Sequence, residues 1–331
     1  MRQLSTLRQD CGTMTEQQSI RVLGEFGLIA AVTSRLASRD PDPDVLLGPG
    51  DDAALVRVGG GEVLVSTDVA VEGGHFRRDW SSAEDVGHRV AAANLADIAA
   101  MGGVARALVV ALSAPADLAV QWALDLTDGL VDEAARVGAS VVGGDVAESE
   151  AVQMAVTALD AAPDRVVRRD GARVGDVVAV AGRLGWAAAG LAVLSRGFRS
   201  PRVVVEAHRR LDPLYDQGPV AARAGATAMV DVSDGLVADL GHVSRASGVA
   251  IDVHSDCFDV PEPLQAVAAA VGVDPVALQI TGGDDHALAA TFAAGVDLPN
   301  GWRAVGSVAE GEGVTVDGEP YDGGTGHRHF Q

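Results

Sequence analysis

Six short acidic motifs follow apolar runs in a chain that contains no lysine. The motifs are Gly50-Asp51-Asp52, Ser66-Thr67-Asp68, Asn94-Leu95-Ala96-Asp97, Gly143-Gly144-Asp145, Asp231-Val232-Ser233-Asp234-Gly235 and Gly282-Gly283-Asp284-Asp285. Carboxylates gathered at strand ends repel one another, so a compact fold that brings them together needs cations among them. Oxygen ligands of this kind suit Mg²⁺, which commonly accompanies phosphate. The pattern therefore predicts a nucleotide enzyme that holds phosphates through metal and arginine.

The absence of lysine and the excess of acid exclude several functions. Without lysine the usual P-loop, Schiff-base and pyridoxal phosphate chemistries are not available. All 25 basic residues are arginine, and 46 acidic residues give a formal charge of −21. This charge argues against nucleic acid and anionic membranes as partners. A phosphate substrate would also be repelled, so cations must reverse the field locally.

The length of 331 residues predicts about two domains, each able to bury a core. A stretch rich in Pro, Asp, Arg and Gly at Asp160–Asp176 is the best boundary. We expect an N-terminal extension over residues 1–19, a first domain over 20–162 and a second over 163–331. Two cysteines give no disulfide framework, and we see no signal peptide or apolar run of transmembrane length. These features favour the cytoplasm.

Hydrophobic periodicity and turn residues predict alternating strands and helices. The elements expected in the first half are helix 20–36, strands 54–58 and 62–71, a helix from Ser82 to Gly102, strand 106–112, a helix from Pro115 to Gly138, and strands 140–142 and 152–159. Those expected in the second half are strand 177–181, helices within 186–211 and 214–224, strand 227–232, helix 236–247, strand 249–253, helix 264–271, and strands 287–292 and 302–308. The order indicates an α/β (α+β) fold.

Three motifs place oxygen ligands on one side of an element. Strand alternation points Ser66 and Asp68 one way and Thr67 the other. Asn94 and Asp97 share a face of an apolar helix, where Asp97 needs a partner. Asp231 and Ser233 point to the same side where a strand passes into a helix. Ser233 is a natural N-cap, and the positive end of that helix could hold phosphate or Mg²⁺.

Other candidate residues have a structural interpretation beside the functional one. His75 follows a Gly73-Gly74 loop near the acidic strand and could contact a phosphate, although a lone histidine is usually structural. Arg168 and Arg169 at the domain boundary could hold a phosphate bidentately or form a solvated pair. No zinc spacing or covalent nucleophile is evident. We expect no catalytic side chain beyond those that bind and position.

Together the motifs resemble those of the thiamine-monophosphate kinase family, within the aminoimidazole-ribonucleotide synthetase-like (PurM-like) superfamily. The resemblance includes Gly24-Glu25-Phe26-Gly27-Leu28-Ile29, Gly74-His75-Phe76 and the extension of the Asn94 motif to Gly102, and it runs from about Gly24 to Phe330. It implies a two-domain fold whose N-terminal mixed sheet carries helices on one face and pairs with a second copy into a β-barrel. The C-terminal domain would be α/β, and the protein a homodimer.

The resemblance also implies a transferase, a kinase that moves the γ-phosphoryl group of ATP to thiamine monophosphate in thiamine diphosphate biosynthesis. The implied ligands of several Mg²⁺ ions are Asp51, Ser66, Thr67, Asp68, Asp97, Asp145, Asp231 and Asp234. ATP would contact Gly144, Asp145, Arg169 and Ser233. The acceptor substrate would contact His75, Asp284 and His327.

This chain departs from the family on the acceptor side. It has Gly282-Gly283-Asp284-Asp285-His286-Ala287 where the family usually has Gly-Gly-Glu-Asp-Tyr-Glu, and His327 where an aromatic residue often stands. Two alternatives therefore remain open. One is another ATP-dependent member of the superfamily, such as an aminoimidazole-ribonucleotide synthetase-like enzyme, and the other is a non-catalytic nucleotide-binding dimer.

Overall fold

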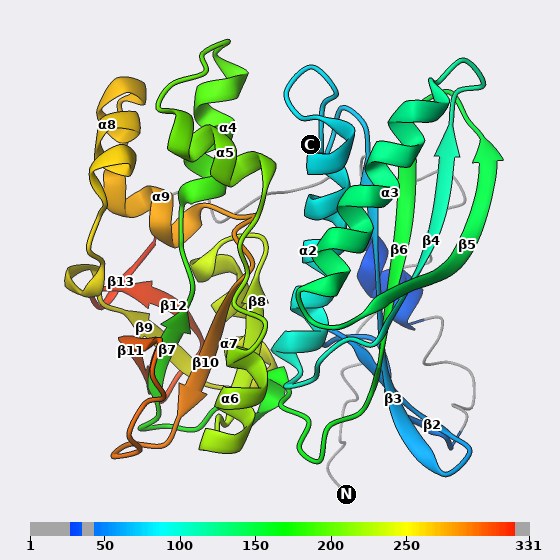
Figure 1. Cartoon of the computed structure of the whole chain (residues 1–331). Coiled ribbons are helices and arrows are strands. Elements are labelled where there is room, and N and C mark those ends of the chain that lie inside the picture. The colour runs from blue at the N-terminus through cyan, green and yellow to red at the C-terminus, as the bar shows by residue number, and fades with distance from the viewer. Residues whose placement is uncertain (1–26, 35–42, 322–331) are drawn as a thin grey trace, which may run out of the picture. The chain divides into compact units, whose positions relative to one another are not determined.

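The structure is a computed structural model that describes residues 27–34 and 43–321. Residues 27–34 are helical, within the predicted helix 20–36. The remainder of that prediction, and His327, lie outside the described residues. In the segment from residue 43 onward, strands and helices form two sheets with their helices (Figure 1), which confirms the predicted α/β class.

The first sheet is mixed and has the order β1-β2-β3-β6-β4-β5. Its strands are β1 (Val45–Leu47), β2 (Ala54–Val58), β3 (Gly61–Val71), β4 (Ala107–Ala114), β5 (Ser140–Glu148) and β6 (Gln153–Ala161). All neighbours are antiparallel except β4 and β5. The helices α2 (Ala83–Ala100) and α3 (Val120–Ala135) pack on one face of this sheet (Figure 1).

The ends of these elements follow local chemistry. Ser82 and Asp85 form a capping box at the predicted start of α2, with reciprocal side-chain to backbone hydrogen bonds. The start of α3 was predicted too early, because the helix begins at Val120 and not at Pro115. Strand β5 is longer than predicted, so Gly144 lies inside it. A Cβ at Gly144 would overlap the carbonyl oxygen of Val110 on β4, which explains why glycine is needed there.

The second sheet has the order β13-β12-β9-β11-β7-β10-β8. Its strands are β7 (Val177–Ala181), β8 (Ala228–Val232), β9 (Ala250–Val253), β10 (Ala287–Phe292), β11 (Trp302–Ala309), β12 (Gly313–Val316) and β13 (Glu319–Pro320). The helices are α4 (Trp186–Ser195), α5 (Arg202–Arg209), α6 (Gln217–Ala224), α7 (Leu236–Ser247), α8 (Glu262–Val271) and α9 (Pro275–Thr281), with short 3₁₀ turns η1 (Arg169–Gly171) and η2 (Ser255–Cys257). Strands β7, β8 and β10 are almost entirely buried, and apart from Asp231 and Thr291 all their residues are apolar.

Helix α2 connects the two sheets, because it packs against β3 and β6 on one side and against β8 on the other. Thirteen of its 18 residues are buried, among them Arg89 and Asn94. A helix enclosed in this way can present polar side chains to both halves of the chain. Among the described helices, no single one combines the length and apolar character needed to cross a membrane; α8 and α9 would do so only jointly, across a bend of 103°.

Candidate active site at the meeting of β3, α2 and β8

Three carboxylates from distant parts of the sequence meet where β3, α2 and β8 approach one another. Oxygens of Asp52, Asp97 and Asp231 lie within 4.8 Å of one another. Asp52 precedes β2, Asp97 is on the inner face of α2, and Asp231 is near the end of β8. Asp52 and Asp231 are buried, at 8% and 3% exposure. This is the oxygen-rich arrangement that a hard dication prefers.

Strand β3 adds two further residues to the cluster. The Ser66 hydroxyl donates to Oδ2 of Asp97 at 2.5 Å, and the Asp68 amide donates to the side-chain oxygen of Asn94 at 3.2 Å. Thr67 points to the opposite face, where it donates to the carbonyl oxygen of Val156. The predicted alternation along this strand is therefore confirmed. Only the side chains of Ser66 and Asp68 face the carboxylates.

The pKa shifts of the clustered carboxylates indicate that the group needs positive charge. Burial raises the pKa of Asp52 to about 8, although Arg169 opposes the shift. Burial, and then the carboxylate of Asp68, raise the pKa of Asp97 well above its usual range. For Asp231 burial is the largest influence and raises the pKa, but the hydrogen bond and charge of His286 together with the charge of Arg169 outweigh it, so the pKa of Asp231 is lowered. Carboxylates so close together are difficult to ionise unless a cation is present.

Arg169 and His286 supply part of that positive charge. Arg169 donates through Nη2 to Oδ1 of Asp52 at 2.5 Å, and its backbone amide donates to Asp51. His286 shares a 2.8 Å hydrogen bond through Nδ1 with Oδ2 of Asp231. The sequence analysis named Asp51 and not its neighbour Asp52, and it did not assign a role to His286. Two adjacent aspartates offer no sequence signal as to which one faces the cluster.

The junction between β8 and α7 differs from the prediction at its cap. Gly235, with φ of +127°, is the N-cap of α7, and Ser233 makes no capping hydrogen bond. The amides of Asp234 and Gly235 instead donate to the carboxylate of Asp239, one turn into the helix. Asp234, Asp239 and His242 form a second group of potential ligands. The Ser233 side chain thus has no structural capping role.

The Gly282-Gly283-Asp284-Asp285 loop crosses to α2. Arg89 donates through Nη2 to Oδ2 of Asp284 at 2.5 Å, and Arg89 is only 8% exposed. Asp284 and His286 both have positive φ, +68° and +49°, which is strained for these residue types. Asp285 accepts hydrogen bonds from the amides of Trp186 and Ala187 and so caps α4. The loop is therefore held at both ends while Asp284 remains partly exposed.

Two predicted residues lie apart from the carboxylates. Asp145 is exposed on β5 and is absent from every group of close ligands among the described residues. His75 accepts the amide proton of Val71 at Nδ1, 3.1 Å away, which leaves Nε2 as the protonated nitrogen. Both remain predictions, since a bound nucleotide would be needed to bring distant groups to one ligand.

Comparison with known proteins identifies relatives of this chain along nearly its whole length. Residues 50–159 match the family model of the N-terminal domain of AIR synthase related proteins. Over 326 residues the chain is 44% identical to thiamine-monophosphate kinase of Mycobacterium tuberculosis H37Rv, covering 97% of this chain and 96% of that protein. A solved structure described as AaThiL complexed with AMPPCP and TMP superposes with a TM-score of 0.86 at 32% identity, covering 95% of this chain and all of that one. The thiamine monophosphate kinase structure from Aquifex aeolicus gives a TM-score of 0.79 at 30% identity, over 89% of this chain and 97% of that one.

The match over residues 50–159 places that part of the chain in the class of AIR synthase related N-terminal domains. Within that class, identity along nearly the whole length distinguishes the family. The chain belongs to the thiamine-monophosphate kinase family.

Proposed function

We propose that the protein transfers the γ-phosphoryl group of ATP to thiamine monophosphate, forming thiamine diphosphate and ADP, in the cytoplasm. The bond between Pγ and the β,γ-bridging oxygen breaks as a phosphate oxygen of the acceptor attacks in line. The main support for this proposal is that Asp52, Asp97 and Asp231 lie close together beside Arg169. The family relationship and the structure with an ATP analogue and TMP support the choice of substrates.

The donor set of the cluster fits Mg²⁺. Its groups offer only oxygen and come from three separate parts of the chain, and the raised pKa of Asp52 and of Asp97 supports a need for positive charge there. We propose that Asp52, Asp68, Asp97 and Asp231 hold Mg²⁺, with Asp51, the Ser66 hydroxyl, a backbone oxygen at Thr67, Asp145 and Asp234 as further ligands. Bound Mg²⁺ would neutralise the phosphates and align donor with acceptor.

The chain's own groups position the reactants. Gly144 and Ser233 would contact ATP, and the fork of Arg169 suits a phosphate because it can donate two parallel hydrogen bonds. His75, held through Nδ1 by the Val71 amide, would contact the acceptor, and Asp284 offers a carboxylate held by Arg89. His327 is a further acceptor-site candidate. An acceptor phosphate is largely deprotonated at neutral pH, so no strong general base is required.

The exposed face of the first sheet supports a homodimer. Helices cover one face only, while Val69, Val142 and Val146 on β3 and β5 are 56%, 63% and 77% exposed. Large apolar side chains exposed on a sheet are a liability unless a partner covers them. We propose that two copies pair these sheets into a barrel. Light scattering should give twice the mass of one chain, and an active monomer would contradict the barrel.

One assay separates this function from the alternatives. Purified protein with ATP, Mg²⁺ and thiamine monophosphate should form thiamine diphosphate and ADP in equal amounts, and Asp97→Asn should not. ATP binding without product would instead indicate a non-catalytic nucleotide-binding dimer. Turnover only with formylglycinamidine ribonucleotide would indicate an aminoimidazole-ribonucleotide synthetase-like enzyme.

A further inference from the structure

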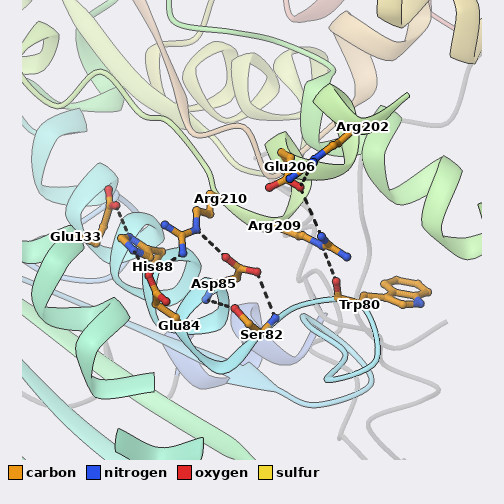
Figure 2. Close-up of polar contacts among 10 residues, drawn as sticks. All are labelled: Trp80, Ser82, Glu84, Asp85, His88, Glu133, Arg202, Glu206, Arg209 and Arg210. Atoms are coloured by element: carbon orange, nitrogen blue, oxygen red, sulfur yellow. Dashed lines mark hydrogen bonds and ion pairs between the residues drawn. The ribbon is translucent and has the colours of Figure 1, made fainter. Parts of the chain in front are cut away.

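A third group of potential ligands lies between α2 and α3 and shares no residue with the proposed phosphate site. It contains Glu84 and His88 of α2 and Asp132 of α3, each offering one ligand atom within 4.8 Å of the others. Figure 2 shows Glu84 and His88 with their neighbour Glu133. Unlike the phosphate site, this cluster includes an imidazole nitrogen. Nitrogen ligands disfavour Mg²⁺ and favour dications such as Zn²⁺.

The backbone contact between the two helices fixes the cluster. A Cβ at Gly129 would overlap the carbonyl oxygen of Glu84, and a Cβ at Gly87 would overlap the carbonyl oxygen of Leu126. The helices therefore touch through their glycines. Asp132 lies three residues after Gly129, and Glu84 three residues before Gly87, so both project from the faces that meet. Their relative positions are set by backbone and do not depend on long flexible side chains.

His88 is held in the orientation of a metal ligand. Its Nδ1 lies 2.9 Å from Oε2 of Glu133, as the dashed line in Figure 2 marks. Glu133 is only 2% exposed, and it accepts hydrogen bonds from Arg136 and Tyr215 at 2.7 and 2.6 Å. A carboxylate so well supplied with donors acts as the acceptor, so Nδ1 carries the proton. The lone pair of His88 is then on Nε2, as in carboxylate–histidine–zinc arrangements.

That lone pair has no hydrogen-bond partner. Nε2 of His88 is buried and unsatisfied among the described residues, and the nearest carboxylate oxygen, on Glu84, is 4.0 Å away. An unsatisfied buried acceptor is destabilising, because it has lost its hydrogen bonds to water without replacement. The hydrogen bond to Glu133 satisfies Nδ1 but not Nε2. A cation between Nε2 and the two carboxylates would satisfy the other nitrogen, after small side-chain shifts toward bonds of about 2.0–2.2 Å.

The surrounding charges favour a cation as well. Arg210 pairs with both Glu84 and Asp85, at 2.8 and 2.6 Å (Figure 2). Arg136 is likewise shared between Glu133 and Asp212. Arg183 also lies 3.9 Å from Asp212, so three arginines pair with four acids, and Asp132 is a fifth acid. Arg210 and Nε2 of His88 both lie nearest to Oε1 of Glu84. Glu84 would therefore ligate an ion through Oε2 after rotation of its carboxylate, while Oε1 keeps Arg210, since a carboxylate has two oxygens.

We propose that Glu84, His88 and Asp132 form a binding site for Zn²⁺ or a similar transition-metal dication that joins α2 to α3. The site is independent of the proposed kinase activity. Its function is to stabilise the contact between α2 and α3. Glu84 would also hold the side chain of Arg210, and Glu133 would orient the ring of His88.

The test titrates Zn²⁺ into full-length protein without a histidine tag, in millimolar Mg²⁺ that occupies the oxygen-only site. Isothermal titration calorimetry should find one Zn²⁺ per chain. His88→Asn removes Nε2 but keeps an N–H donor for Glu133, and it should weaken Zn²⁺ binding about tenfold or more. Asp132→Asn, at an exposed position, should weaken Zn²⁺ binding to a similar extent. This variant tests the site if His88→Asn does not fold.

The matched control is His254→Asn. His254 is 42% exposed beside Asp252 and should leave Zn²⁺ binding unchanged. Thermal unfolding should show Zn²⁺ stabilising the wild type and the His254 variant but neither of the other two. No Zn²⁺ site in excess Mg²⁺, wild-type affinity in both cluster variants, or equal weakening in the control would each overturn the proposal.

Discussion

Arg169 reaches from the short η1 turn to the loop before β2, where Nη2 lies 2.5 Å from Oδ1 of Asp52. Side-chain exposures of 18% and 1% make this a largely buried pair. It ties the second half of the chain to the carboxylate cluster.

Removing that arginine should destabilise the protein. Arg169→Ala leaves Asp52 buried without its partner, and the expected cost is about 3 kcal/mol in urea unfolding without metal. Arg168→Ala is the matched control, because Arg168 is exposed and pairs only with Asp170 at the surface. Its cost should stay below about 1 kcal/mol. Equal effects would show that the Arg169 pair carries no particular stability.

The three clustered carboxylates should be required for Mg²⁺ binding without nucleotide. Asp97→Asn and Asp231→Asn each remove a charge from the group within 4.8 Å, so neither should gain thermal stability from Mg²⁺. Their kcat should fall at least about a hundredfold. Asp170→Asn, a surface change, should behave as wild type. Retention of the Mg²⁺ shift in either cluster variant would remove that residue from the ligand set.

Asp145 should behave differently from that group. It is exposed on β5, so we expect it to engage metal only together with ATP. Asp145→Asn should therefore lower kcat about a hundredfold while keeping the Mg²⁺ stabilisation of the nucleotide-free protein. Unchanged turnover would remove Asp145 from the site.

Stabilisation by Mg²⁺ should increase with pH. Burial raises the pKa of Asp52 from 3.8 to about 8 in the metal-free fold, so the folded state binds more protons than the unfolded state between these values. Stability from this group is present below pH 4 and lost as pH rises toward 8. Mg²⁺ reverses the loss by displacing the proton. The difference between the melting temperatures with and without Mg²⁺ should grow as pH rises from about 5.5 to about 8, which is the upper part of the shift. A constant difference would contradict this account.

Asp284 should affect the binding of thiamine monophosphate and not the binding of ATP. Asp284→Ala removes the carboxylate that Arg89 holds, and it should raise KM for thiamine monophosphate about tenfold while KM for ATP changes less than about threefold. Asp284→Glu should remain active, because it restores the acid usual in the family. A weakened affinity for ATP alone would reassign the loop to the nucleotide.

The α2–α3 glycine contact should be essential for stability. Gly129→Ala would overlap the Glu84 carbonyl oxygen and force the helices apart, so we expect a loss of more than about 3 kcal/mol in urea unfolding. Gly241→Ala in α7 is the control, because a Cβ there meets nothing within 4 Å. It should be neutral or stabilising by about 1 kcal/mol. Similar effects of the two changes would contradict the close contact.

Local chemistry allowed much of this protein to be predicted from its sequence. The capping box of α2, the alternation of Ser66, Thr67 and Asp68, and the α/β order depend on residues close along the chain. Periodicity and backbone geometry determine such features before any distant contact forms. The same proximity made the acidic motifs recognisable as family motifs.

Long-range packing decided the rest. Sequence could not show that Asp52 and not Asp51 joins Asp97 and Asp231, because that depends on which face of the loop meets α2 and β8. It also suggested Ser233 as a cap, although the Asp239 carboxylate, four to five residues further on, reached the free amides. His88 became a candidate ligand only because Gly87 and Gly129 bring two helices into contact. Sequence thus determined which groups were available, and tertiary packing decided which of them lie close enough to act together, because electrostatic and coordinate bonds depend on distances of a few ångströms that only the fold sets.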